Sequence, residues 1–358
     1  MTTHVASLVV TPNGVLTPGE VTTEDGTIVD VRPHVGAAPE RILCPGFVDL
    51  QVNGHDDVDV ATACDEDWER LDVLLADQGV TAWCPTITTA PIEVYEERLQ
   101  RIATAAQRRS AHGRPTIIGA HLEGPFLGDA HGAHNPAWVA ALDLEWLRAL
   151  PPIVRIVTLG PEQPLAVEAI VALTARQVLV SMGHSKASFE QAISGADAGA
   201  RLVTHLFNGM APLHHRAPGL LGAALSDDRL VPSLIADGVH VHPAALRAAA
   251  RAKGRGGWVL VTDAVGWQTH DRVEIVDGAP RLPDGTIAGS CARMDECVAR
   301  MVQEAGIDIV DVVHAAATTP ARLVGIEGER GALAAGLRAD LVFLDPHTLR
   351  VTEVLTAE

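Results

Sequence analysis

The chain has 358 residues, 47% of them hydrophobic and 20% charged, so it can bury a large core and is not disordered. Its formal net charge of −18 argues against a nucleic acid or an anionic membrane surface as a main partner. No apolar run approaches the ~18 residues of a membrane span, and the N-terminus lacks the segments of a signal peptide. The five cysteines are scattered without a CxxC spacing, which predicts reduced thiols in the cytoplasm.

Residues 1–44 are predicted to form short strands separated by tight turns. Asn-Gly at 13–14 and Asp-Gly at 25–26 stand between alternating apolar segments, as in β-hairpins. Strand-like segments return after residue 325. We therefore expect residues 1–44 and 325–358 to be the two parts of one small β-sandwich domain.

Residues 45–324 alternate short apolar strands with amphipathic helices. Several of the strands are continuous β-branched blocks, which is typical of strands buried on both faces. The predicted strands are Phe47–Val52, Val80–Thr86, Thr116–Leu122, Ile153–Leu159, Val178–Met182, Leu202–His205, Ser233–Ala236 and Trp258–Thr262. The predicted helices are 65–78, 93–107, 165–175, 188–198 and 243–252. Eight such units favour a TIM-like (β/α)8 barrel, and a doubly wound sheet, which usually has fewer strands, is the alternative.

Polar side chains follow most of the predicted strands, at the end where barrel enzymes carry their chemistry. Glu123 follows the third strand, His184 follows the fifth and His205 ends the sixth. One carboxylate and two imidazoles, with a position left for water, form a common open zinc site, and Fe²⁺, Co²⁺ or Mn²⁺ accept the same ligands. These residues therefore predict one divalent metal ion. The alternative is three unrelated polar residues at strand ends.

Two further segments suggest acid–base chemistry and an anionic ligand. Asp263 directly follows the eighth strand, where it is either a proton acceptor or the N-cap of the next segment. Residues 214–216, His-His-Arg, place potential positive charge beside Asn208 in an acidic chain. They indicate either a site for an anionic group such as phosphate or an exposed loop. The chain has neither a Walker loop nor a dinucleotide-binding fingerprint.

A series of short motifs occurs in order along nearly the whole chain. They are PGFVDLQVNG at 45–54, HLEGPF at 121–126, GAHNP at 132–136, GHS at 183–185, THLFNGM at 204–210, RAPGL at 216–220, IADGVH at 235–240, LVTDAV at 260–265, IAGS at 287–290 and GALAAGLRADLVFLD at 331–345. With this combination the chain resembles the N-acetylglucosamine-6-phosphate deacetylases of the amidohydrolase superfamily.

The resemblance implies catalytic roles for the matching positions. Glu123, His184 and His205 would hold the essential divalent metal. Asp263 would be the general base and acid. His240 would contact the acetyl carbonyl or help to stabilise its oxyanion.

The resemblance also implies a phosphosugar site and a homodimer. His134 would contact sugar hydroxyls, and Asn208 and Gly209 would contact the phosphate or the sugar. Arg216 would pair with the phosphate, either in its own subunit or across the dimer interface.

One motif departs from the superfamily pattern. Many amidohydrolases carry His-x-His at the end of the first strand, where it binds a second metal, and this chain has Gln51 and Asn53 there. Amides are poor zinc ligands compared with imidazole, so we expect a single tightly held metal. His55, Asp56 and Asp57 follow, and we expect them to be solvated loop residues at the mouth of the barrel. The alternative is that they change the number of metal ions bound.

The implied activity is metal-dependent hydrolysis of the N-acetyl group of N-acetylglucosamine 6-phosphate. The same chemistry on another amino-sugar phosphate, such as N-acetylgalactosamine 6-phosphate, is an alternative. A cyclic-amide hydrolase resembling the dihydroorotases would need His-x-His and often a bridging lysine. A metal-free barrel that only binds phosphosugars is the non-enzymatic alternative.

Overall fold

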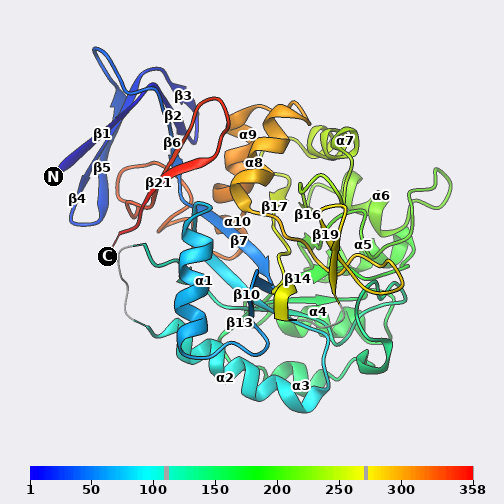
Figure 1. Ribbon diagram of the computed structural model, residues 1–358. Helices are drawn as coiled ribbons and strands as arrows, with labels where there is room; N and C mark the ends of the chain where they lie inside the picture. The colour runs from blue at the N-terminus through cyan, green and yellow to red at the C-terminus, as the bar shows by residue number, and fades with distance from the viewer. Residues whose placement is uncertain (109–112, 270–272, 358) are drawn as a thin grey trace.

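The apolar segments between residues 47 and 260 form a parallel sheet that curls into a barrel (Figure 1). The computed structural model describes residues 1–108, 113–269 and 273–357. Residues 109–112 and 270–272 of the expected barrel domain, and Glu358 of the expected C-terminal part, lie outside the described residues.

The barrel strands pair in chain order. They are β7 (Phe47–Val52), β10 (Val80–Thr88), β12 (Ala120–Glu123), β13 (Val154–Leu159), β14 (Leu179–Met182), β15 (Leu202–Val203), β16 (Val231–Leu234) and β17 (Val259–Leu260). Each pairs in parallel with the next, and a parallel bridge between Val52 and Ala264 connects the first strand to the segment after the last. The predicted (β/α)8 barrel is confirmed, and the doubly wound sheet is wrong.

The third predicted strand is interrupted in the structure. It is split into β11 (Thr116–Ile117), which pairs with β10, and β12, which pairs with both β10 and β13. Gly119 lies at the break with a φ of +145°, and a Cβ there would lie 1.9 Å from the Cγ of Arg155. The interruption therefore requires glycine at this position.

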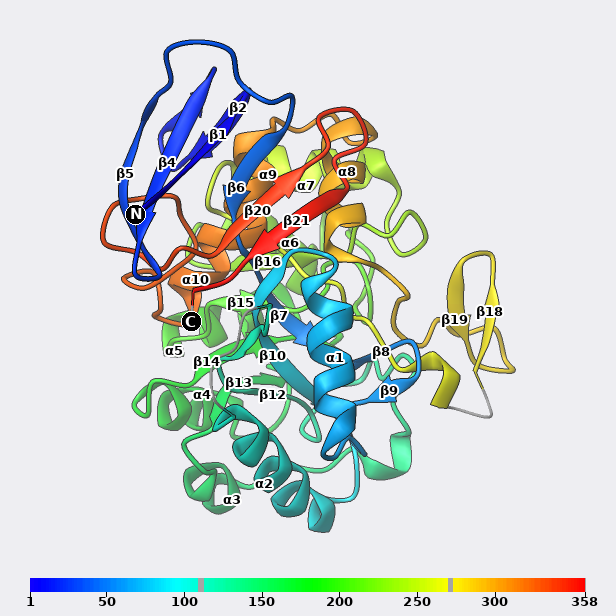
Figure 2. The same cartoon turned by 60° about the vertical axis from the view of Figure 1, so that its left-hand side comes forward.

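Helices cover the outside of the barrel (Figures 1 and 2). They are α1 (Glu66–Ala76), α2 (Tyr95–Ala106), α3 (Leu144–Ala149), α4 (Ala166–Thr174), α5 (Phe189–Ala198), α6 (Gly219–Ser226), α7 (Pro243–Lys253), α8 (Met294–Gln303), α9 (Ile309–Val313) and α10 (Thr319–Leu323). Short helical turns are η1 (Ile92–Val94), η2 (Pro136–Trp138), η3 (Trp267–Thr269) and η4 (His314–Thr318). The predicted amphipathic segments form α1, α2, α4, α5 and α7. Periodicity does not predict α6, because its sequence GLLGAALS has no charged face.

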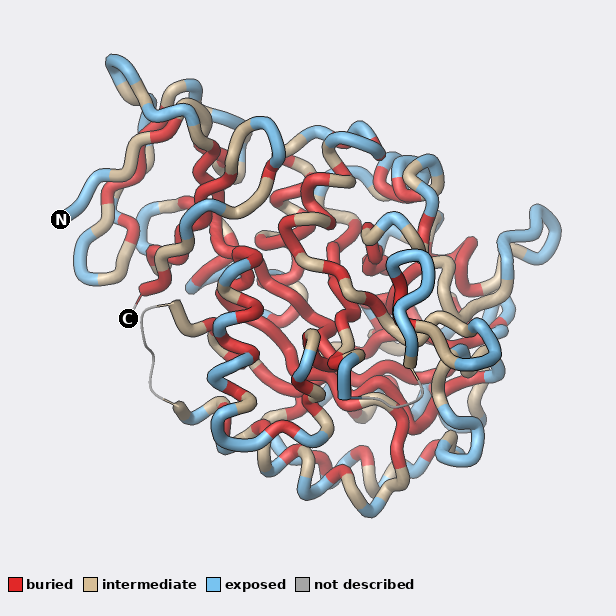
Figure 3. Tube along the Cα trace, viewed as in Figure 1, coloured by how far each residue is buried: buried red, intermediate tan, exposed pale blue. Residues whose placement is uncertain are grey.

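Two pairs of buried polar side chains inside the barrel contact one another. Figure 3 shows the strands as its buried centre. The Oγ1 of Thr262 donates to the Oδ2 of Asp49 at 2.6 Å, which ties the end of the last strand to β7. The Nε2 of His121 lies 2.7 Å from the Oγ1 of Thr158. Burial raises the pKa of Asp49 to about 7 and lowers that of His121 to about 4.

The two ends of the chain meet in one sheet beside the barrel (Figure 2). Its strands, in order, are β21 (Val351–Leu355), β20 (Leu341–Leu344), β6 (Ile42–Pro45), β2 (Leu8–Thr11) and β3 (Gly14–Leu16). A second sheet consists of β1 (Thr2–Ala6), β4 (Gly19–Glu24) and β5 (Thr27–Pro33). Val21, Leu43 and Phe343 belong to one buried cluster that spans both sheets. The expected boundary between residues 44 and 45 falls inside β6, and the first barrel strand, β7, begins at Phe47.

Two short hairpins complete the described chain. β8 (Gly54–His55) pairs with β9 (Val58–Asp59), and β18 (Glu274–Val276) pairs with β19 (Ala279–Arg281). The second hairpin stands away from the body of the molecule in Figure 2. No helix among the described residues has the length and apolar character needed to cross a membrane.

Candidate active site

Three of the predicted ligand atoms converge above the barrel. The Oε1 of Glu123 lies 3.1 Å from the Nε2 of His184 and 3.0 Å from the Nε2 of His205, and these two nitrogens are 2.9 Å apart. All three residues are buried. A tetrahedral ion with bonds of about 2 Å needs ligand atoms roughly 3.3 Å apart, so this triangle is close to the required size.

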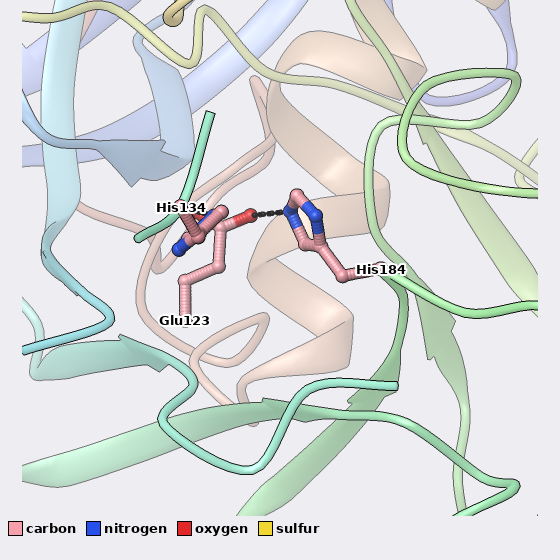
Figure 4. A group of neighbouring side chains, drawn as sticks. All are labelled: Glu123, His134 and His184. Atoms are coloured by element: carbon pink, nitrogen blue, oxygen red, sulfur yellow. Dashed lines mark hydrogen bonds and ion pairs between the residues drawn. The ribbon is translucent and has the colours of Figure 1, made fainter. Parts of the chain in front are cut away.

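The position of the proton on the His184 ring favours a cation between this ring and Glu123. The Nδ1 of His184 lies 3.1 Å from the carbonyl oxygen of Ala130 and donates to it, so the Nε2 of the neutral ring carries a lone pair. That lone pair faces the carboxylate of Glu123 (Figure 4). Two electron pairs directed at one another fit a metal ion between them, so the residues present suit the metal that the sequence predicts.

His134 lies beside this triangle and offers a second possible set of ligands. Ligand atoms of Glu123, His134 and His184 lie within 4.8 Å of one another, and Figure 4 shows His134 next to the carboxylate of Glu123. The Nε2 of His134 is 3.9 Å from the Oε2 of Glu123, whereas every distance in the set with His205 is 3.1 Å or less. The tighter set with His205 is therefore the better metal site.

The protonation of His134 suits it to accept a hydrogen bond. Thr89 donates its hydroxyl proton to the carbonyl oxygen of Glu123, so the Nδ1 of His134, 2.9 Å away, donates to the Thr89 hydroxyl. Burial, followed by the nearby charge of His184, lowers the pKa of His134 to about 3. The ring is neutral, with the lone pair of Nε2 available to a ligand's O–H or N–H group.

The backbone turns sharply at three of the strand ends. His184, His205 and Asp263 follow strands β14, β15 and β17, and their φ angles are +48°, +29° and +51°. Positive φ is costly for residues other than glycine and persists where the surrounding structure enforces it. These three residues of different strands share this conformation and gather at one end of the barrel.

Two amides hold the carboxylate of Asp263. The Oδ1 of Asp263 accepts hydrogen bonds from the Nε2 of Gln51 at 3.0 Å and from the Nδ2 of Asn53 at 2.7 Å. Gln51 also donates to the Oε1 of Glu123 at 3.0 Å, and the hydroxyl of Thr204 donates to Gln51 at 2.7 Å. Among the described residues, no donor contacts the Oδ2 of Asp263, so this oxygen is left to the cavity. Burial and the charge of Glu123 raise the pKa of Asp263 to about 6.

The site opens into a cavity of about 790 Å³. His134, His240, Asn208 and Gly209 line it together with the triangle and Asp263. The remaining predicted residue does not: Arg216 is exposed and lies outside this lining, in the loop before α6. The structure therefore brings together every predicted site residue except Arg216.

The hairpin that follows Asn53 corrects one expectation. His55 is only 5% exposed, so it is not the solvated residue that the sequence predicts, whereas Asp57 is exposed. His55 is the second residue of β8 and is covered where β8 and β9 pack against α1.

Two positioning groups are not among the predicted site residues. Glu162 accepts hydrogen bonds from the amides of Asp129 and Lys186 and from the hydroxyl of Ser185, and so ties the loop after β12 to the loop after β14. Asp237 contacts His240, with 2.7 Å between its Oδ2 and the Nδ1 of the ring. The three-residue spacing of Asp237 and His240 was a usable signal, but a carboxylate at such a spacing is common.

Comparisons with known proteins find similar sequences along nearly the whole chain. A sequence model of the amidohydrolase family matches residues 42–357. The N-acetylglucosamine-6-phosphate deacetylase of Homo sapiens is 39% identical over 92% of this chain and 85% of its own length. The N-acetylgalactosamine-6-phosphate deacetylase of Escherichia coli O157:H7 is 37% identical over 96% of this chain and 95% of its own.

Solved structures give the same picture. The N-acetylglucosamine-6-phosphate deacetylase of Thermotoga maritima superposes with a TM-score of 0.91 at 30% identity, covering 99% of this chain and 98% of that one. A mutant of the N-acetyl-D-glucosamine-6-phosphate deacetylase of Mycobacterium smegmatis, in complex with N-acetyl-D-glucosamine-6-phosphate, has a TM-score of 0.91 at 32% identity and the same coverage.

Proposed function

The chain belongs to the amidohydrolase family, and on this premise we propose that it hydrolyses the N-acetyl group of N-acetylglucosamine 6-phosphate with the help of a divalent metal. The products are glucosamine 6-phosphate and acetate. The observation that carries the proposal is the buried triangle of Glu123, His184 and His205 beside the carboxylate of Asp263. A ligand triangle and a positioned base are the two parts that hydrolysis of a resistant amide requires.

We infer that Glu123, His184 and His205 hold one metal ion, with Zn²⁺ preferred and Fe²⁺, Co²⁺ or Mn²⁺ as substitutes. When bound, the ion supplies Lewis-acid polarisation of the acyl carbonyl and a lower pKa for water. A single ion is supported by Gln51 and Asn53. Both amides are engaged with Asp263, and neither is a good ligand for a second ion.

Asp263 is the proposed general base and acid. Its Oδ1 is held by two amide donors, which orients the carboxylate and leaves Oδ2 for the proton of the attacking water. The same oxygen then returns that proton to the departing amine nitrogen. A pKa raised to about 6 favours both transfers near neutral pH.

The neighbouring residues bind and orient the sugar. His240 donates to the acyl oxygen as negative charge develops there. His134 accepts a hydrogen bond from a sugar hydroxyl, as its neutral ring allows. Asn208 and Gly209 contact the sugar or the phosphate from the loop after β15.

The phosphate needs a cation that the described lining of the cavity does not supply. No arginine or lysine is among the described residues that line it, and Arg216 is exposed elsewhere. We propose that the protein is a homodimer. In this dimer, Arg216 of one subunit binds the phosphate of the substrate in the cavity of the other subunit. The −18 charge of the chain makes such a local cation necessary for a phosphorylated ligand.

The specific alternative is the same reaction on N-acetylgalactosamine 6-phosphate. It is supported by the bacterial relative that acts on this sugar, which is almost as similar as the human one and matches more of the chain. The two substrates differ in the configuration of one hydroxyl. A cyclic-amide hydrolase fits less well, because Gln51 and Asn53 stand where that reaction needs imidazoles.

The deciding experiment is acetate release from N-acetylglucosamine and N-acetylgalactosamine, each with and without the 6-phosphate. The expected result is rapid release from N-acetylglucosamine 6-phosphate. Preference for the galacto sugar selects the alternative, and no release from any of the four by metal-loaded protein refutes both. We also place the protein in a reducing cytoplasm, a proposal supported by five unpaired cysteines.

A further inference from the structure

The segment after β16 folds back on itself through one carboxylate. The Oδ1 of Asp237 accepts hydrogen bonds from the backbone amides of Val239 at 2.9 Å and His240 at 2.8 Å. Its Oδ2 lies 2.7 Å from the Nδ1 of His240. Gly238 allows the turn with a φ of +82°. Both side chains, Asp237 and His240, are only 6% exposed, so this pair is a built and buried contact.

The charged residues that line the cavity indicate what the contact between Asp237 and His240 does. The described lining includes the carboxylates of Asp59, Glu123 and Asp263 but no arginine or lysine. His184 and His205 direct their Nε2 atoms at Glu123. His240, in contrast, pairs with a separate carboxylate, that of Asp237. This contact is made by Nδ1, so Nε2 on the opposite side of the ring is not engaged by it.

We propose that Asp237 is a positioning residue that keeps a proton on the Nδ1 of His240 and balances the charge of its imidazolium, so that Nε2–H meets an anionic oxygen of the substrate. This inference rests on the proposed function for the identity of that oxygen. The pairing of Asp237 with His240 stands on the geometry alone.

The two nitrogens of an imidazole divide their roles in this way because each makes one hydrogen bond. With Nδ1–H committed to Asp237, Nε2 is the only nitrogen left for a ligand. Burial raises the pKa of Asp237, but its hydrogen bond with His240 and two backbone amides outweigh it and lower that pKa overall. Asp237 is therefore an anion. A doubly protonated His240 ring carries the opposite charge, so its Nδ1–H donates to Asp237 while its Nε2–H donates to an oxyanion on the other side.

The decisive variant is Asp237→Asn. An asparagine oxygen still accepts the two backbone amides, so the turn is kept. Its amide group then donates to Nδ1, which removes the anion and moves the proton of the neutral ring to Nε2. Asp143→Asn is the matched control, because Asp143 also accepts two backbone amides, at the start of α3, and holds no histidine.

The direct readout is nitrogen NMR of protein labelled in its histidine rings, with Zn²⁺ bound and without substrate. His240 is identified as the signal lost in His240→Gln. The expected wild-type ring carries a proton on Nδ1 near neutral pH, and Asp237→Asn carries it on Nε2 alone. A wild-type ring without a proton on Nδ1 overturns the proposal even if the variant does not fold.

The second readout is the split between kcat and KM in acetate release. Asp237→Asn is expected to lower kcat about 10- to 100-fold with little change in KM, as for one charged hydrogen bond made in the transition state. Asp143→Asn should match the wild type. Equal kcat in the two variants overturns the proposal. If wild-type protein hydrolyses none of the four sugars, the proposed function fails, and the NMR result still decides the pairing of Asp237 with His240.

Discussion

His184 directs the unprotonated nitrogen of its ring at the carboxylate of Glu123, with 3.1 Å between the two atoms. This arrangement is held from behind, because the opposite nitrogen of the ring donates to the carbonyl oxygen of Ala130. An acceptor facing an acceptor is unfavourable in a buried site unless a cation lies between them. The contact between His184 and Glu123 therefore indicates by itself that the site binds a cation.

The first prediction concerns this metal. His184→Ala and His205→Ala should each lower the metal bound per chain, by more than the roughly 10- to 100-fold loss of affinity that follows removal of an outer partner. Elemental analysis of purified protein measures this directly, and acetate release should fall in parallel. His347→Ala, which removes an exposed imidazole, is the control. Normal metal content and a normal rate of acetate release in both ligand variants would show that His184 and His205 are not metal ligands.

The second prediction concerns the proton carrier. Asp263→Asn keeps the size of the side chain and removes the base, so metal and substrate should still bind. The rate should fall ~10²- to 10⁴-fold, the range for a positioned acid–base group. Asp345→Asn, in an exposed turn, is the control. A variant that loses its metal would make Asp263 a ligand, and a near wild-type rate would leave it only a structural role.

The third prediction concerns pH. Burial raises the pKa of Asp263 to about 6, and a base works only when it has lost its proton. Therefore kcat/KM should fall as the pH drops through this value. A cation beside Glu123 favours the carboxylate form, so the midpoint in the metal-loaded enzyme should lie at pH 6 or below. A pH–rate profile checks this. An acidic limb that persists unchanged in the residual activity of Asp263→Asn would assign it to another group.

The fourth prediction concerns the phosphate. Arg216→Ala should cost ~1.5–3 kcal/mol in kcat/KM for the phosphorylated sugar, as for a hydrogen bond to a charged group, and change little for the unphosphorylated one. Parallel loss of both activities would refute phosphate recognition by Arg216.

Mixing tests where Arg216 acts. If it serves the partner's cavity, a mixed dimer of Arg216→Ala and Asp263→Asn chains has one site with both defects and one with neither, so activity returns on mixing. Activity that stays at the level of the parents would place Arg216 in its own site.

The fifth prediction concerns the shared sheet. Removing residues 331–358 exposes the edge of β6, which pairs with β20 from Ile42 to Pro45. The truncated chain should aggregate, because an unpaired apolar strand edge recruits other chains. Thr352→Asp, an exposed change on β21, should remain in solution after centrifugation. A truncated chain that is monodisperse and fully active would contradict the prediction.

Much of the fold and part of the candidate site follow from the sequence. Apolar runs separated by amphipathic helices are enough to predict the barrel, because parallel strands buried on both faces leave that pattern. The polar residues after these runs, Glu123, His184, His205 and Asp263, meet in space because the carboxyl ends of parallel strands lie at one end of a barrel. Order along the chain was therefore sufficient to predict that these side chains lie together.

Only the tertiary structure decided what each of these side chains contacts. The hydrogen bond from Thr204 to Gln51 joins residues 153 positions apart and depends on how the barrel closes. The link from Glu162 to two loops, and the burial of His55, depend equally on packing between distant segments. Strand periodicity places a residue on a face, but side-chain direction and hydrogen-bond partners are settled by the atoms that surround it after folding, and these come from elsewhere in the chain.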